Sequence, residues 1–139
     1  MLLLDVKNRR WSREMCDVCG ISEQMLPELH ESYEVVGMLK QEIADKFGLK
    51  DVKIIAGAGD NAAAAVGTGV VGEGGCNISL GTSGTLFVSS SSYKEDKVNA
   101  LHSFCHADGG WHLMGCILSA ASCNSWWVNG ILQSTDYKK

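Results

Sequence analysis

The chain has 139 residues, a net charge of −4 and 45% hydrophobic residues. This length suits one ordinary domain or parts of two, and the composition is that of a globular rather than a disordered protein. The basic runs are short, so no nucleic-acid-binding surface is expected. No apolar run reaches the ~18 residues of a membrane span. We therefore expect a cytoplasmic protein that binds neither membrane nor nucleic acid.

Six cysteines include one C-x-x-C pair, Cys16 and Cys19. A single pair is weak evidence for zinc, which usually needs a second pair or a Cys/His pair at ligand spacing. His102 and His106, with Cys105 between them, leave a composite site conceivable. We expect reduced structural cysteines, with Cys105, Cys116 and Cys123 buried as small hydrophobes. The alternative is a metal or redox module built on Cys16 and Cys19.

The first half of the chain predicts helices before a glycine-rich turn. Residues 12–20 form a candidate helix that Ser12 caps and Gly20 ends. A second short segment runs from Ser22 to Pro27, after which Leu26, Leu29 and Tyr33 are expected to pack. Met38–Phe47 is amphipathic and ends at Gly48.

A strand and a second helix flank the glycine-rich turn. Val52–Ala56 is apolar and rich in β-branched residues, which predicts a buried parallel strand. Asp60 then opens an alanine-rich helix over Asn61–Val66.

The second half of the chain changes to a hairpin pattern. Asn77–Leu80 and Thr85–Ser89 are strand-like, and strands are also predicted over 102–106 and 111–114, around the turn at Asp108. Ile117–Leu132 has helical spacing and carries Trp126 and Trp127, expected in a core or on a normally covered surface that drives self-association. The change near Val71 predicts a domain boundary, with one part over residues 1–71 and the other over 72–139.

Asp60 is the first candidate functional residue. The glycines before it allow a sharp turn and the close approach of a ligand. A strand, a turn and a helix start place this carboxylate at the carboxyl edge of a sheet, where open α/β folds bind ligands. An ionised Asp accepts a hydroxyl proton, whereas the simpler interpretation of Asp60 is a helix N-cap.

The loop Gly81-Thr82-Ser83-Gly84 is the second candidate. Its amides and hydroxyls can converge on one point, and such nests bind phosphate oxygens. It is not a Walker loop, because no Gly-Lys-Ser/Thr follows. The alternative is an ordinary hairpin turn.

The two features together resemble a known family. GAGDNAAAAVGTGVV followed by NISLGTSGTLFVSS is similar to the FGGY carbohydrate kinases, and among them to the xylulose kinases. The separation of 22 positions from Asp60 to Thr82 matches that family's spacing. Flanking segments also resemble it: Trp11-Ser12, Leu26-Pro27-Glu28-Leu29 and Val36-Gly37 upstream, and His102, His106, Trp111 and Leu118–Ala121 downstream.

The resemblance implies a partial α/β actin/hexokinase-like (ribonuclease H-like) ATPase fold. Residues 1–71 would end the sugar-binding domain, and residues 72–139 would begin the ATP-binding domain. It implies that Asp60 is the general base towards the terminal sugar hydroxyl, and that Asn61 and Gly59 contact the sugar. It further implies that Gly81, Thr82, Ser83 and Gly84 contact the phosphates of ATP, which acts with Mg²⁺.

The family is three to four times longer than this chain, so its first phosphate loop and adenine site are missing here. We therefore expect no kinase activity from the chain alone. D-xylulose is the expected sugar, with glycerol, gluconate, ribulose or rhamnulose as alternatives. Asn61 in place of Gln argues against glycerol. A non-catalytic α/β binding module remains the competing interpretation, and a homo-oligomer is possible.

Overall fold

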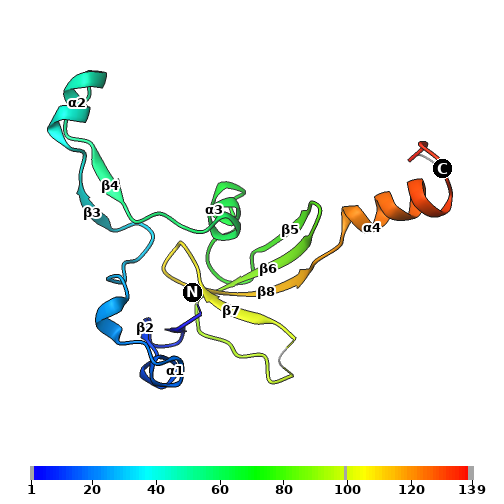
Figure 1. Ribbon diagram of the computed structural model, residues 1–139, viewed down its shortest axis with the longest axis horizontal. Helices are drawn as coiled ribbons and strands as arrows, with labels where there is room; N and C mark the ends of the chain where they lie inside the picture. The colour runs from blue at the N-terminus through cyan, green and yellow to red at the C-terminus, as the bar shows by residue number, and fades with distance from the viewer. Residues whose placement is uncertain (1, 99, 138–139) are drawn as a thin grey trace.

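The fold is taken from a computed structural model that describes residues 2–98 and 100–137. Its elements are β1 (Leu4–Asp5), β2 (Arg10–Trp11), α1 (Arg13–Cys19), the 3₁₀ turn η1 (Glu23–Met25), β3 (Val35–Met38), α2 (Gln41–Phe47), β4 (Lys53–Ile55), α3 (Asp60–Gly67), β5 (Cys76–Leu80), β6 (Gly84–Ser90), β7 (His102–Cys105), β8 (Trp111–Ile117), α4 (Ala121–Ser125) and the π-helical η2 (Trp126–Ile131). Figure 1 shows this mixed α/β chain as a central sheet from which three arms extend.

The central sheet has the strand order β5-β6-β8-β7, with every neighbouring pair antiparallel. The hairpin predicted around the Gly81–Gly84 loop is confirmed, as is the hairpin around Asp108. Helix α3 packs on one face, where Ala65, Val70 and Phe87 form the buried core. This core is small, and Ala62 of α3 packs against it as well.

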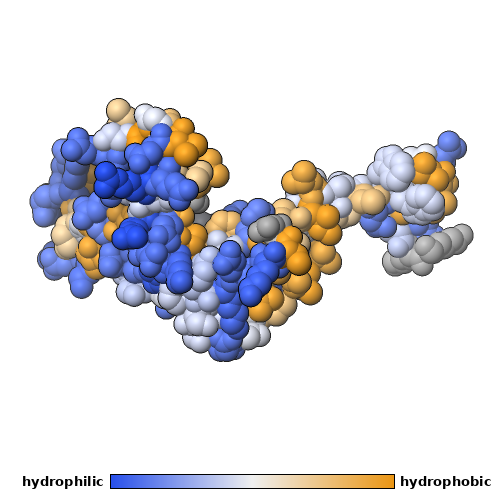
Figure 2. Space-filling model, turned by 90° about the horizontal axis from the view of Figure 1, so that it is seen from below, coloured by the Kyte–Doolittle hydropathy of each residue, from blue (hydrophilic) through white to orange (hydrophobic). Residues whose placement is uncertain are grey.

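The opposite face of the sheet is largely uncovered. Residues directly opposite in an antiparallel pair point to the same side. The exposed apolar side chains that share this face are Ile78, Leu80, Leu86, Val88 and Ile117. Figure 2 shows hydrophobic atoms gathered where the C-terminal helical segment leaves the sheet.

Helix α1 forms as the sequence predicted. The Ser12 hydroxyl accepts a hydrogen bond from the Met15 amide at 3.3 Å, and Gly20 ends the helix in the left-handed region with φ of 64°. Turn η1 likewise begins after Ser22, whose hydroxyl accepts from the Gln24 amide. The expectation that Tyr33 packs is wrong, since it is exposed.

The parallel strand predicted over Val52–Ala56 is wrong in direction. Strand β4 pairs antiparallel with β3, and its Ile55 is exposed. An apolar run indicates a strand but does not identify the strand that pairs with it. Here the pairing strand is Val35–Met38, and its last residue is also the predicted start of the helix Met38–Phe47. Helix α2 begins at Gln41 rather than Met38 and ends at Gly48, as expected.

The helical segment near the C-terminus is shorter than the predicted range Ile117–Leu132. Ile117 belongs to β8, and helical structure begins at Ala121. Both Trp126 and Trp127 are exposed on this segment, which extends away from the sheet in Figure 1. Among residues 2–98 and 100–137, no helix has the length and apolar character that a bilayer crossing requires.

Candidate active site

Asp60 is the first residue of α3, and Gly59 occupies the N-cap position. Gly57, with φ of 78°, turns the chain in a conformation that other residues rarely adopt. The Asp60 Oδ1 atom accepts a hydrogen bond from the Asn61 amide at 2.8 Å. Its Oδ2 atom has no hydrogen-bond partner in the described part of the chain, and the residue is exposed. The simple N-cap interpretation is therefore wrong in position, and one carboxylate oxygen is available to a ligand.

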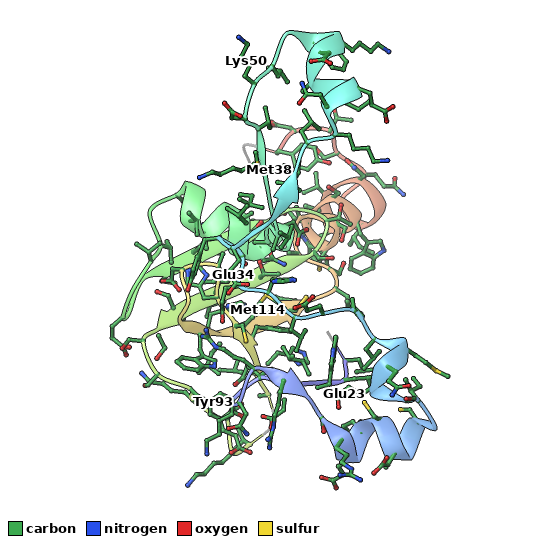
Figure 3. All side chains as sticks on the ribbon, turned by 90° about the vertical axis from the view of Figure 1, so that its left-hand side faces the viewer. Glu23, Glu34, Met38, Lys50, Tyr93 and Met114 are labelled. Atoms are coloured by element: carbon green, nitrogen blue, oxygen red, sulfur yellow. The ribbon has the colours of Figure 1, made fainter. Side chains whose placement is uncertain are left out.

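A cavity of about 540 Å³ lies beside Asp60. We call it the Asp60 pocket, and its lining residues are Leu4, His30, Glu31, Ser32, Ala56, Gly57, Ala58, Gly59, Asp60, Asn61, Ala62, Phe104, Cys105, His106, His112 and Met114. Its size falls within the range of small-molecule sites, roughly 300–1,000 Å³. Figure 3 places Met114 and Glu34 near the centre of the molecule, between the arm that carries Met38 and Lys50 and the side that carries Glu23.

The pocket thus draws on distant parts of the sequence. The loop before α3 forms one wall, and strands β7 and β8 form another. The structure brings Gly59, Asp60 and Asn61 together in this pocket. It does not bring the Gly81–Gly84 loop into its lining.

The Gly81–Gly84 loop is held by the segment that leads into α4. The Thr82 carbonyl accepts hydrogen bonds from the Ala120 amide at 2.8 Å and the Ser122 hydroxyl at 3.0 Å. The Gly81 amide donates a hydrogen bond to the Ser83 carbonyl within the loop. The exposed Thr82 hydroxyl has no partner among residues 2–98 and 100–137, so it is the loop group best placed to bind a ligand.

Gly84 and Ser83 have structural contacts. Gly84 is buried, and a Cβ there would lie 2.9 Å from the Ala120 Cβ. The Ser83 hydroxyl donates to the Leu118 carbonyl at 3.2 Å. These contacts fix the loop on the 118–122 segment.

One side-chain contact links the start of α3 to the strand that follows the loop. The Thr85 hydroxyl donates to the Asn61 Oδ1 atom at 3.5 Å. Further along α3, the Asn77 amide group donates to the Thr68 hydroxyl at 3.2 Å. Since Asn61 follows Asp60 and Thr85 follows Gly84, the first of these contacts ties the start of α3 to the strand that leaves the loop, although the loop does not line the pocket.

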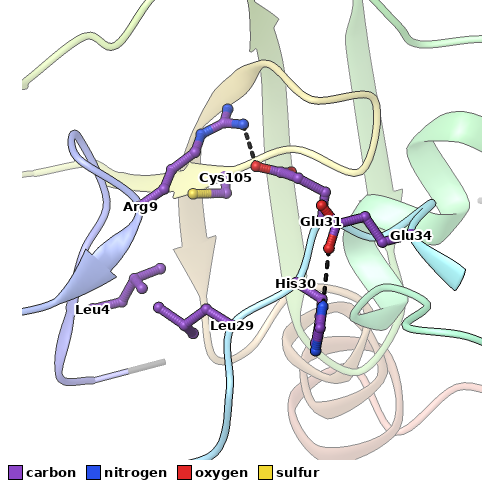
Figure 4. A pocket seen from close by; sticks show the side chains of 7 residues that line it. All are labelled: Leu4, Arg9, Leu29, His30, Glu31, Glu34 and Cys105. Carbon is purple, nitrogen blue, oxygen red and sulfur yellow. Dashed lines mark hydrogen bonds and ion pairs between the residues drawn. The ribbon is translucent and has the colours of Figure 1, made fainter. Parts of the chain in front are cut away.

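A second cavity of about 220 Å³ adjoins the first (Figure 4). It is lined by Leu4, Arg9, Leu29, His30, Glu31, Glu34 and Cys105, four of which also line the Asp60 pocket. Figure 4 shows the Arg9–Glu31 ion pair on one side and the His30–Glu34 contact, 3.0 Å long, on the other.

Arg9 connects the N-terminal hairpin to the turn between β7 and β8. Its guanidinium donates to the carbonyls of Gly109 and Gly110 and lies 4.3 Å from the ring centre of Trp111. It also pairs with Glu31. Sequence reasoning missed Arg9, because an isolated arginine carries no motif.

Two histidines lie buried in the wall of the Asp60 pocket. His106 is 1% exposed. His112 is stacked on Phe87, with ring centres 3.9 Å apart. Burial, reinforced by His106, lowers the pKa of His112 to about 4, so this imidazole is neutral at pH 7.

Glu73 lies in an exposed turn, with 52% of its side chain accessible, but its carboxylate has several partners. Its carboxylate accepts from the Lys94 ammonium at 2.7 Å and from both the amide and the hydroxyl of Ser91. The Lys94 contact, followed by those to Ser91, lowers the pKa of Glu73 to about 2. Asp108 stabilises the turn predicted there, since its carboxylate accepts hydrogen bonds from the amides of Gly72 and Gly110.

All six cysteines are free in the structure. The expectation of burial is wrong for Cys116 and Cys123, which are exposed, and Cys105 is half-buried. Of the other three, Cys16 is buried, whereas Cys19 and Cys76 are exposed. Burial raises the pKa of the Cys16 thiol. Residues 2–98 and 100–137 contain no group of three or more His, Cys, Asp or Glu side chains that could hold a metal ion, so the composite zinc site finds no support there.

Comparison with known proteins identifies the family. A model described as the FGGY family of carbohydrate kinases, N-terminal domain, matches residues 1–67. Residues 1–67 belong to the FGGY family of carbohydrate kinases. The xylulose kinases of Escherichia coli K12 and Klebsiella pneumoniae are 46% and 45% identical to the chain over 124 residues, 88% of its length.

A solved structure of an FGGY relative supports the fold. The chain resembles the xyloylose kinase of Brucella ovis with a TM-score of 0.88 and 44% identity, over 96% of this chain and 28% of that one. The chain spans about a quarter of the length of the curated xylulose kinases that it matches, 26% in both cases above.

Proposed function

We propose that this chain is the central segment of an ATP-dependent sugar kinase, with D-xylulose as the acceptor and D-xylulose 5-phosphate as the product. The observation that carries the proposal is the exposed Asp60 carboxylate, which opens α3 and lines a pocket of about 540 Å³. The 46% identity to a xylulose kinase supports the choice of sugar. Residues 1–71 would end the sugar-binding domain of an actin/hexokinase-like fold, and 72–139 would begin the ATP-binding domain.

In this proposal Asp60 accepts the proton of the terminal sugar hydroxyl as its oxygen attacks the γ-phosphate of ATP. The unpaired Oδ2 atom supports that role, since it has a free lone pair for the proton. Asn61 and Gly59 border the same pocket and would contact the sugar. Thr82, with Gly81, Ser83 and Gly84, would hold phosphate oxygens, and the exposed Thr82 hydroxyl is their most direct contact.

Mg²⁺ commonly binds through nucleotide phosphates, waters and only one or two carboxylates. The described residues offer no cluster that would hold it by themselves. Mg²⁺ bound together with ATP would supply electrophilic stabilisation of the phosphates.

A hybrid enzyme tests the proposal. The part of this chain that aligns with the E. coli xylulose kinase over 124 residues replaces the corresponding segment of that enzyme, and turnover of D-xylulose is measured by coupled ADP release. Loss of a general base lowers turnover by about 10²–10⁴-fold, so Asp60→Asn should do so with ATP binding retained. Asp17→Asn, an exposed carboxylate on α1, is the matched control and should leave turnover unchanged.

An active hybrid whose turnover survives Asp60→Asn would refute the base role. The 139-residue chain alone should consume no ATP in the same assay. Parallel reactions use glycerol, gluconate or ribulose in place of D-xylulose. A higher kcat/KM for one of them would identify that compound as the substrate instead of D-xylulose.

A further inference from the structure

Two neighbouring histidines in the wall of the Asp60 pocket differ in their hydrogen bonding. The His106 Nε2 atom bonds the Val70 carbonyl at 2.9 Å, and its Nδ1 atom accepts from the Ala107 amide at 2.8 Å. Neither ring nitrogen of His112 has a partner among residues 2–98 and 100–137, although the residue is only 5% exposed and its Nδ1 atom is fully buried. Because buried polar groups are nearly always paired, His112 lacks a partner that the site should supply.

The surroundings of His112 determine what that partner can be. Its ring is stacked on Phe87 and contacts Phe104, with ring centres 5.3 Å apart. In this environment the imidazole is neutral, so one nitrogen donates and the other accepts. A sugar hydroxyl does both, whereas a phosphate group would favour a charged imidazolium. The site therefore suits an uncharged polyhydroxylated ligand.

The position of His112 connects it to the proposed chemistry. His112 lies on β8, opposite Phe104 in the strand register, while Asp60 lies on α3. Both line the Asp60 pocket, and the Phe104 ring on β7, which also lines it, offers an apolar surface for sugar C–H groups. A sugar whose terminal hydroxyl meets Asp60 would then extend towards β8.

We propose that His112 hydrogen-bonds a hydroxyl of the acceptor sugar in the Asp60 pocket, and so makes β8 a specificity-determining wall of that site. This inference rests on the proposed kinase function. It adds a sugar-binding residue from the part of the chain after residue 71 to those at Gly59–Asn61.

The test uses the whole 139-residue chain and D-xylulose as the probe. Imidazole ¹⁵N resonances and backbone amides are followed by NMR during a sugar titration. The His112 nitrogens should shift together with the Asp60 and Asn61 amides, whereas the partnered His106 nitrogens should not. Shifts at Asp60 and Asn61 without any at His112 would overturn this inference and leave the acceptor site standing. Shifts at His112 alone would support sugar binding but count against Asp60 as the base. No shift at either place would overturn the inference, while the hybrid assay still decides the kinase function.

Substitutions then separate hydrogen bonding from packing. His112→Phe keeps the stack on Phe87 but removes both nitrogens, and a lost hydrogen bond should weaken sugar binding about threefold to tenfold. His112→Gln restores a donor and an acceptor and should recover part of the loss. Leu113→Val is the matched control, because Leu113 is the next residue on β8 and points to the other face of the sheet. Equal affinity of the folded Phe variant and the wild type would overturn the inference, and if that variant does not fold, the wild-type titration decides.

Discussion

Replacing Arg9 tests the connection between the N-terminal hairpin and the β7–β8 turn. Arg9→Ala removes the bonds to Glu31 and to the carbonyls of Gly109 and Gly110, together with the contact on Trp111. A hydrogen bond to a charged group contributes about 1.5–3 kcal/mol. The side chains of Arg9 and Glu31 are 26% and 24% exposed, so solvent weakens each contact. We expect a total loss of about 2–4 kcal/mol in the free energy of unfolding.

The backbone of Arg9 provides an internal control. Its φ of 52° is left-handed, which costs a residue other than glycine about 1–2 kcal/mol. Glycine avoids that cost in the folded state. Its greater conformational freedom, however, stabilises the unfolded chain by about 0.4–1 kcal/mol relative to alanine. Arg9→Gly loses the same side-chain contacts as Arg9→Ala, and it should therefore be more stable than Arg9→Ala by about 0.5–1 kcal/mol.

Equilibrium urea unfolding, followed by circular dichroism and tryptophan fluorescence, measures both differences. Arg9→Lys is a third variant, which keeps the charge but cannot reproduce the planar two-carbonyl contact and should lie between wild type and Arg9→Ala. A loss below about 0.5 kcal/mol for Arg9→Ala, typical of an ordinary surface site, would refute the structural role. An alanine variant at least as stable as the glycine variant would refute the argument about φ.

Two further substitutions probe the second half of the chain. The pKa of Glu73 is lowered from 4.5 to about 2, so its stabilisation is complete above pH 4.5 and is lost as the pH falls towards 2. Glu73→Gln should flatten the acid dependence of the melting temperature in that window, and an unchanged slope, as expected for the exposed control Glu95→Gln, would contradict this. Gly84→Ala places a Cβ 2.9 Å from the Ala120 Cβ and should cost about 1–3 kcal/mol. The double variant with Ala120→Gly should recover much of that loss, and a single variant that melts like wild type would show that the loop moves freely on the 118–122 segment.

Local signals explain what the sequence predicted well. Ser12 and Gly20 bound α1 because their side-chain and backbone preferences act within one turn. The hairpin around Gly81–Gly84 follows from two strand-like runs that are close in sequence. Gly59, Asp60 and Asn61 share a pocket for the same reason, since they are consecutive, but their roles stay predictions.

The features that were missed depend on distant partners. The direction of β4 is set by β3, and the acidic pKa of Glu73 is set by Lys94, 21 residues further along the chain. Arg9 and His112 carry no motif, and their importance appears only when the 109–111 turn and the Asp60 pocket are seen in three dimensions.

The contacts of the N-terminal hairpin have a consequence for synthesis of the protein. Arg9 meets the Gly109 carbonyl 100 residues later, and the Trp111 indole donates to the Val6 carbonyl at 3.0 Å. A ribosome that adds about 5–20 residues per second needs about 5–20 s to deliver those partners. A hairpin with two residues in each strand does not hold by itself. The segment from Leu4 to Trp11 therefore emerges from the ribosome without its partners, and during that interval it is a natural target for chaperones.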